Sequence, residues 1–148
     1  MRIYLDVCCL NRPFDGHAQD RVSLESEAIL TILSRCQQKI WILVSSEVVN
    51  IEISKIPDDD RRQKVSFLSS ISESHIVIDE DTEKRAIGLQ ELGFNSFDAL
   101  HIACAEKGKA DVLLTTDDAL LRKASQNKDE LNVRLENPVK WLMEEIEK

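Results

Sequence analysis

Residues 1–10 read MRIYLDVCCL, and one acid interrupts the apolar run that begins at residue 3. The segment Ile3–Leu5 is short, apolar and β-prone, which predicts a buried first strand. Asp6 ends that strand, and a carboxylate among apolar residues is costly to bury without a partner or a metal ion. A turn residue with no function is the alternative for Asp6. The end of the first strand is therefore a candidate functional site.

The rest of the chain alternates between strand-like and helical patterns. Further buried strands are expected at Ile40–Val44, Ile76–Ile78 and Val112–Leu114, with room for a short one near Val133. Helices are expected over Val22–Cys36, from Ser45 or Ser46 to Pro57, from Asp58–Asp60 through Ile71, over Thr82–Leu92, from a cap at Ser96 to Lys107, over Asp117–Ser125 and around Trp141. The polar stretch Asn11–Asp20 is expected to form a loop. This order predicts an α/β domain whose mostly parallel sheet is covered by helices on both faces.

Length and composition favour one soluble domain over residues 1–148. A chain of 148 residues that is 43% hydrophobic and 31% charged fits a single globular core. No apolar run suggests a membrane span or a signal peptide, so we expect a cytoplasmic protein with no membrane partner. The cysteines lack zinc-site spacing and are expected to be reduced thiols: Cys8, Cys9, Cys36 and Cys104.

The formal net charge is −8, which argues against a protein that holds nucleic acid by broad phosphate neutralisation. It allows an enzyme whose positive charge arrives as a bound metal ion. It also suits a basic partner protein.

Two further acids fall where the expected fold would place a site. Ligands of open parallel sheets bind beyond the carboxyl ends of the strands, and Asp117 closely follows Val112–Leu114. Helix capping alone explains Asp117 equally well. Glu52 lies four residues after Val48 on the apolar stripe of its helix, a position that a solvated acid would avoid. A solvated Glu52 at the edge of the stripe, with Glu47 serving the helix dipole, is the alternative.

A fourth acid, Asp98, lies in the first turn of the helix expected from Ser96, where the helix dipole alone would favour it. His101 follows three residues later and is expected to be a satisfied histidine on a packed helix, so no histidine-based nucleophilic catalysis is assigned. Four carboxylates without histidine suit Mg²⁺ or Mn²⁺, and their mutual repulsion would favour entry of such an ion. One or two ions there would polarise a phosphodiester and generate the attacking hydroxide.

Four segments, in this order, resemble motifs of the PIN-domain nucleases, and especially the toxins of VapBC-type toxin–antitoxin modules. They are IYLDVCCLN (3–11), SSEVVNIEI (45–53), SFDALHIA (96–103) and LLTTDDAL (113–120). Each motif is weak alone, but the ordered set spans nearly the whole chain. The resemblance implies a three-layer α/β/α fold, with a sheet of four to five strands, and a Mg²⁺- or Mn²⁺-dependent endoribonuclease.

The resemblance also implies site residues and partners. The acidic positions of the family, which supply catalysis and metal binding, correspond to Asp6, Glu52, Asp98 and Asp117. Its polar positions near the metal correspond to Asn11, Thr115 and either Ser45 or Ser46. Similar toxins act on RNA, form homodimers and are silenced by a cognate antitoxin, so those three partners are expected. Ala119 departs from the pattern, because many members carry a further acid there, and Asp118 is expected to point elsewhere.

Other functions stay open at this point. They include a PIN-fold RNA-processing nuclease without an antitoxin and a non-catalytic interaction module that retains the fold. A phosphotransfer domain of the receiver or haloacid-dehalogenase type needs an acid pair or D-x-D-x-T, and LDVCC offers one acid and no threonine. RNA contacts or an ordinary solvated face are the two interpretations of Arg12, Arg61, Arg62, Lys64, Arg122 and Lys123. Phe14 would either stack on an unpaired base or pack under its loop.

Overall fold

The computed structural model describes all 148 residues and centres on a five-stranded sheet. Its strands are β1 (Arg2–Leu5), β2 (Ile42–Ser46), β3 (Ser74–Ile76), β4 (Val112–Leu114) and β5 (Arg134–Glu136). The strand order is β3-β2-β1-β4-β5, and every neighbouring pair is parallel. The prediction of a mostly parallel sheet of four to five strands is therefore confirmed, with β1 at its centre.

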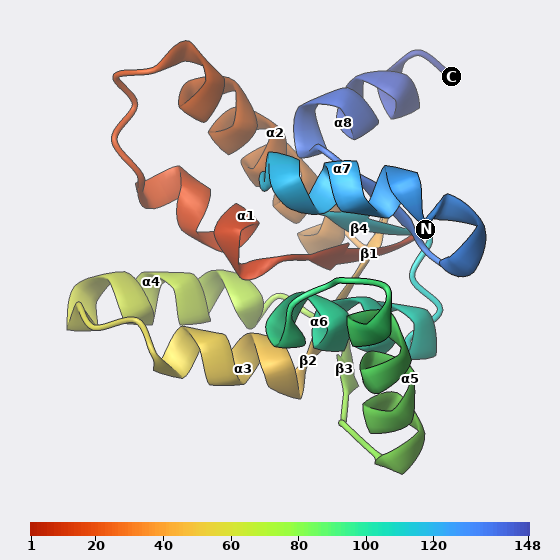
Figure 1. Cartoon of the computed structure of the whole chain (residues 1–148). Coiled ribbons are helices and arrows are strands. Elements are labelled where there is room, and N and C mark those ends of the chain that lie inside the picture. Colours follow the sequence, from red (N-terminus) through yellow and green to blue (C-terminus); the bar gives the residue numbers. More distant parts are fainter.

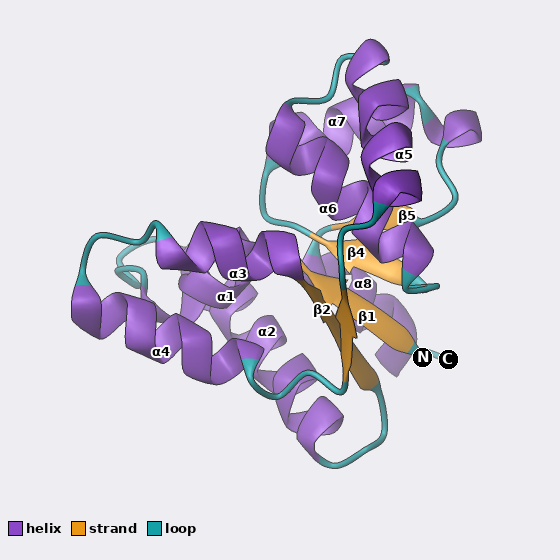
Figure 2. Cartoon of the chain, turned by 90° about the horizontal axis from the view of Figure 1, so that it is seen from below, coloured by secondary structure: helices purple, strands orange, loops and turns teal.

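Helices cover both faces of this sheet, which confirms the three-layer α/β/α arrangement. They are α1 (Val7–Asn11), α2 (Asp20–Gln37), α3 (Glu47–Ser54), α4 (Asp59–Ser69), α5 (Glu80–Glu91), α6 (Ser96–Lys107), α7 (Asp118–Gln126) and α8 (Pro138–Ile146). Figure 1 shows α2 beside α8 on one side of the sheet and α5 beside α6 on the other. In Figure 2 the pair α3 and α4 extends away from the sheet. None of the helices combines the length and the apolar character that crossing a lipid bilayer requires.

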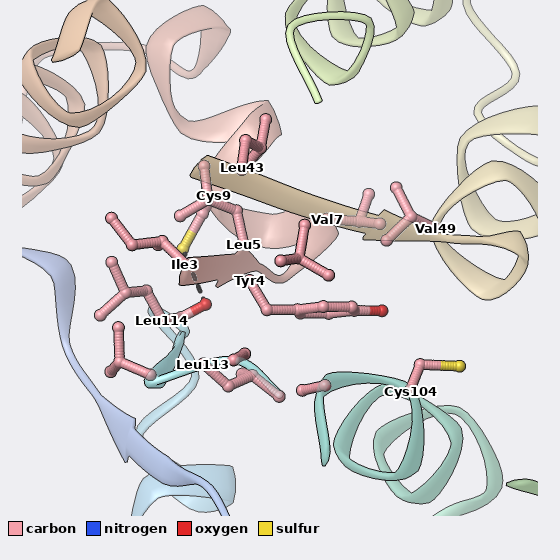
Figure 3. Close-up of a cluster of buried hydrophobic side chains, with 14 of the residues drawn as sticks. Ile3, Tyr4, Leu5, Val7, Cys9, Leu43, Val49, Cys104, Leu113 and Leu114 are labelled. Atoms are coloured by element: carbon pink, nitrogen blue, oxygen red, sulfur yellow. Dashed lines mark hydrogen bonds between the residues drawn. The ribbon is translucent and has the colours of Figure 1, made fainter. Parts of the chain in front are cut away.

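The core is built around β1. Ile3, Tyr4 and Leu5 are almost completely buried, as expected for a central strand with helices on both faces. Figure 3 shows them beside Leu43 of β2 and Leu114 of β4. Full burial of a side chain of this size contributes about 1.5–3 kcal/mol, so β1 is a major source of stability.

Polar residues at the carboxyl ends of three strands cap the helices that follow. Asp6 caps α1, Ser46 caps α3 and Asp117 caps α7, each through side-chain hydrogen bonds from backbone N–H groups. Such a cap contributes about 1 kcal/mol. The short strand-to-helix junctions therefore fix both the helix starts and the direction of these polar side chains.

The predicted positions of two strands are wrong by two residues. The second strand is Ile42–Ser46 rather than Ile40–Val44, and the third is Ser74–Ile76 rather than Ile76–Ile78. Pairing with β2 ends at Ile76, and the backbone N–H of Ile78 instead donates to Glu47 at 2.7 Å. Apolar character continues past the end of the ladder, so it does not mark the end of the strand.

Two local predictions near the helix starts are also wrong. The stretch Asn11–Asp20 is not all loop, because α1 includes Asn11 and Arg12–Phe14 forms a 3₁₀ turn. The cap of α6 is Asn95 rather than Ser96, since the Asn95 side chain accepts the N–H of Asp98 at 2.8 Å. Both residue types are good caps, and only the local backbone distinguishes them.

Gly108 at the end of α6 should be intolerant of a side chain. A Cβ added there would lie 2.9 Å from Val44 Cγ1 and 3.0 Å from Ile76 Cδ1. Val44 is buried and β-branched, so it cannot move aside freely. Gly108→Ala should therefore lower the free energy of unfolding by about 1–3 kcal/mol in urea titrations.

Gly88→Ala is the matched control for this prediction, because a Cβ at Gly88 in α5 meets nothing within 4 Å. It should be neutral or stabilising by up to about 1 kcal/mol. Equal stability of the two variants would show that the close approach at Gly108 is unimportant.

Candidate active site

A pocket of about 470 Å³ opens where β1 and β4 end. All four predicted acids line it: Asp6, Glu52, Asp98 and Asp117. They come from the β1–α1 junction, α3, the first turn of α6 and the β4–α7 junction. The fold thus brings together four carboxylates that lie far apart in the sequence.

Asp6 is 7% exposed, and several donors fix its carboxylate. Oδ1 accepts the N–H of Val7 at 2.7 Å, and Oδ2 accepts the hydroxyl of Thr115 at 3.0 Å. The thiol of Cys8 lies 3.4 Å from Oδ2. Thr115 also accepts the backbone N–H of Asp117 at 3.1 Å, so its hydroxyl links two of the acids.

Asp117 is exposed, and its Oδ1 accepts the N–H groups of Ala119 at 2.9 Å and Leu120 at 3.2 Å. Asp117 therefore caps α7 and lines the pocket at the same time. The positive end of the α7 helix dipole also lies at this carboxylate, an arrangement common for acids at the start of a helix.

Asp98 shows how crowded the acids are. Burial, and after it the negative charges of Asp6 and Asp117, raises the pKa of Asp98 from the ordinary value 3.8 to about 6. An acid with a raised pKa in a pocket is typical of a functional site.

Glu52 meets His101, which sequence reasoning had assigned to packing alone. His101 is 1% exposed, and its Nε2 is hydrogen-bonded to Oε1 of Glu52 and lies 3.7 Å from Oδ1 of Asp6. Burial lowers the pKa of His101, but the hydrogen bond that its ring donates to Glu52 and the charge of Asp6 outweigh this effect, so the pKa is raised. His101 is thus both packed and in contact with the acid cluster.

The other polar candidates occupy different places. Asn11 lines the pocket, and its Oδ1 accepts from Arg61 at 3.4 Å. Ser46 is completely buried and does not line the pocket, but its Oγ lies 2.7 Å from the hydroxyl of Tyr4. Ser45 is instead hydrogen-bonded to Ser69, at 3.4 Å. Of the two serines, Ser46 is therefore the one that is linked to the site, through Tyr4.

Basic side chains near the pocket are mostly paired within the protein. Arg61 donates to Asp15 at 2.8 Å, and Arg12 contacts both Asp15 at 3.2 Å and the buried Glu25 at 3.0 Å. These ion pairs hold the turn after α1 against α2 and α4. They leave these two arginines engaged in structure rather than free for a ligand.

Asp118 is paired outside the pocket. Arg21 donates to both of its carboxylate oxygens, at 2.7 and 2.9 Å. The Arg21 guanidinium lowers the pKa of Asp118. Asp118 therefore does not stand in for the acidic residue that many family members carry at the position of Ala119.

Sequence reasoning missed several residues of the pocket wall: Val7, Cys8, Asn95, Ser96 and Phe97. All of them lie within two residues of Asp6 or three residues of Asp98. These residues could have been predicted from the sequence, because each is a near neighbour of Asp6 or Asp98 in the chain.

The donor set fits a hard divalent cation. Carboxylate oxygens are the ligands that Mg²⁺ and Mn²⁺ prefer, and four of them face one pocket. One ligand atom each of Asp6, Glu52 and His101 lies within 4.8 Å of the others, so the carboxylates of Asp6 and Glu52 are near enough to share a single ion.

Comparison with known proteins places this site in a family. The sequence matches the PIN domain family over residues 3–126, so the chain belongs to that family. The comparison with curated proteins gave no match.

Two solved structures share the fold. One is FitAcB from Neisseria gonorrhoeae, with a TM-score of 0.60, 13% identity and coverage of 92% of this chain and 97% of that chain. The other is VapBC2 from Rickettsia felis bound to a promoter DNA fragment, with a TM-score of 0.63, 19% identity and coverage of 93% and 98%. At these identities the likeness concerns the fold.

The burial of Asp98, together with the crowding of the acids, predicts that the stability of the protein in EDTA depends on pH. Asp98 binds its proton more tightly in the folded protein, so its contribution to stability falls as the pH rises from about 4 to about 6. Asp98→Asn removes the charge and should stabilise the metal-free protein more at pH 7 than at pH 5. Thermal unfolding of both proteins at the two pH values measures the difference.

Asp118→Asn is the control, because Arg21 already stabilises that charge in the folded protein. It should give no gain in stability at pH 7. If Asp98→Asn also gives none, repulsion among the four acids is not significant.

Proposed function

We propose that this protein is a divalent-metal-dependent endoribonuclease that hydrolyses RNA phosphodiester bonds. The observation that carries the proposal is the convergence of Asp6, Glu52, Asp98 and Asp117 on one pocket. Membership of the PIN domain family supports the same conclusion.

Mg²⁺, or alternatively Mn²⁺, is the proposed cofactor, and the four acids are its proposed ligands and the catalytic residues. A bound ion would polarise an oxygen of the phosphodiester and lower the pKa of a water molecule bound to it. The protein's own part is to fix the carboxylates. Thr115 orients Asp6, and the backbone N–H groups of α7 orient Asp117. Asn11 and Ser46 complete the proposed polar surroundings.

The wall of the pocket suits a single-stranded nucleic acid. Phe97 lines it, and the ammonium of Lys55 lies 4.7 Å from the centre of the Phe97 ring. An aromatic face next to a cation can stack a base and contact a phosphate, and neither interaction reads sequence. We therefore propose an unpaired region of RNA as the substrate.

We further propose that the protein is the toxin of a toxin–antitoxin pair that acts in the cytoplasm as a homodimer. The Rickettsia felis neighbour carries the VapBC name, the type of module whose toxins this sequence resembles. The net charge of −8 suits a cognate antitoxin that presents a basic side chain to the acidic pocket.

Metal-dependent cleavage should require the acids. Asp6→Asn and Asp98→Asn should each lower cleavage of a single-stranded RNA by at least about 100-fold while leaving the circular dichroism spectrum unchanged. Excess EDTA should abolish cleavage by the wild type. Asp118→Asn is the control and should cleave at the wild-type rate, since its carboxylate is paired with Arg21. Wild-type rates in both acid variants would leave a non-catalytic module as the better interpretation.

The toxin role makes a separate prediction. Induced expression of the wild type should arrest growth, Asp6→Asn should not, and co-expression of a short protein encoded next to it should restore growth. Growth arrest without any neighbouring partner gene would favour an RNA-processing nuclease instead.

A further inference from the structure

Three buried side chains connect the core to Glu52. The hydroxyls of Ser46 and Tyr4 lie 2.7 Å apart, and the Tyr4 hydroxyl lies 2.6 Å from Nδ1 of His101. Nε2 of His101 is then hydrogen-bonded to Oε1 of Glu52. Ser46, Tyr4 and His101 are each at most 1% exposed, so water does not compete for these bonds. Figure 3 shows Tyr4 extending from β1 with its hydroxyl toward the side on which Val49 and Cys104 lie.

The direction of the hydrogen bonds follows from the donors available. If His101 is neutral and Nδ1 is bare, Tyr4 donates to Nδ1, Ser46 donates to Tyr4, and the proton of His101 is on Nε2. If His101 is charged, both nitrogens carry protons and Nδ1 donates to Tyr4. The remaining tautomer would place the lone pair of Nε2 against the ionised carboxylate of Glu52, which is repulsive. Both favourable arrangements therefore direct an N–H of His101 at Glu52.

Glu52 needs such a donor. It lies on α3, its side chain is 27% exposed, and the bond with His101 is its one side-chain hydrogen bond. Without it, repulsion by Asp6 and Asp98 would favour conformers that turn the carboxylate out of the pocket. Nε2 also lies 3.7 Å from Oδ1 of Asp6, so the polar N–H edge of the ring lies between two negative charges.

We propose that Ser46, Tyr4 and His101 form a positioning relay that holds the carboxylate of Glu52 in place for a divalent cation. The proposal rests on the metal-dependent function argued above. His101 acts through Oε1 of Glu52 and leaves the other carboxylate oxygen for the ion. Partners of this kind behind a metal ligand typically change metal affinity by about 10–100-fold.

The test is Mn²⁺ affinity, measured by electron paramagnetic resonance of unbound Mn²⁺ with the full-length protein. His101→Leu removes the donor and should raise the dissociation constant about 10–100-fold. His101→Gln retains an amide N–H and should recover part of this loss. Tyr4→Phe keeps the packing but frees the imidazole ring, and should weaken Mn²⁺ binding several-fold, on the order of 3–10-fold. Ser69→Ala, which removes a buried hydroxyl whose hydrogen-bond partner is Ser45, is the matched control and should bind Mn²⁺ as the wild type does.

The outcomes separate the relay from the proposed function. Absence of Mn²⁺ binding by the wild type overturns the metal-dependent function, and the relay with it. Wild-type affinity in folded His101→Leu overturns the relay alone, and wild-type affinity in Tyr4→Phe does so even if His101→Leu fails to fold. Electron spin-echo modulation from a directly coordinated ¹⁴N would make His101 a ligand and overturn the hydrogen-bonded assignment.

Discussion

Repulsion among carboxylates held at one edge of a parallel sheet is the constraint on which the site depends. Such groups would ordinarily separate or take up protons. Here three of them are restrained by different donors: Asp6 by Thr115 and the N–H of Val7, Asp117 by the start of α7, and Glu52 by His101. Asp98 has no comparable donor, which is consistent with the raised pKa of its carboxyl group. The repulsion that remains among these acids is unfavourable, and a bound cation would relieve it.

The stability for this arrangement comes from elsewhere in the fold. β1 is buried on both faces, and the helix caps that place Asp6 and Asp117 also satisfy backbone donors. Because these residues serve the fold and the pocket together, substituting either one affects both. Their neighbour Asp118, paired with Arg21 outside the pocket, shows that acids adjacent in sequence can have unrelated roles.

The sequence predicted the parallel sheet and its layers, because strands and helices leave periodic patterns. It also pointed to the four acids that line one pocket: Asp6 and Asp117 because they follow strands, and Glu52 because it lies on an apolar stripe. It did not predict α1, since Val7–Leu10 continues the apolar run of β1 and shows no period of its own. His101 was assigned to packing because its partner Glu52 belongs to another helix, and no local spacing relates the two. Tyr4 was overlooked for a similar reason: within an apolar strand its ring explains its burial, and only the structure shows where its hydroxyl leads.

The central position of β1 has a consequence for the order of folding. The strand β1 pairs on one side with β2 and on the other with β4, which follows it more than 100 residues later in the sequence. Pairings that span most of a chain form slowly, since a long loop must close before they contribute stability. Asp117 joins Asp6 only when β4 docks, so a ribosome-bound fragment lacking that strand has no complete site. The topology itself therefore completes the acidic pocket only after β4 has been synthesised and has paired with β1.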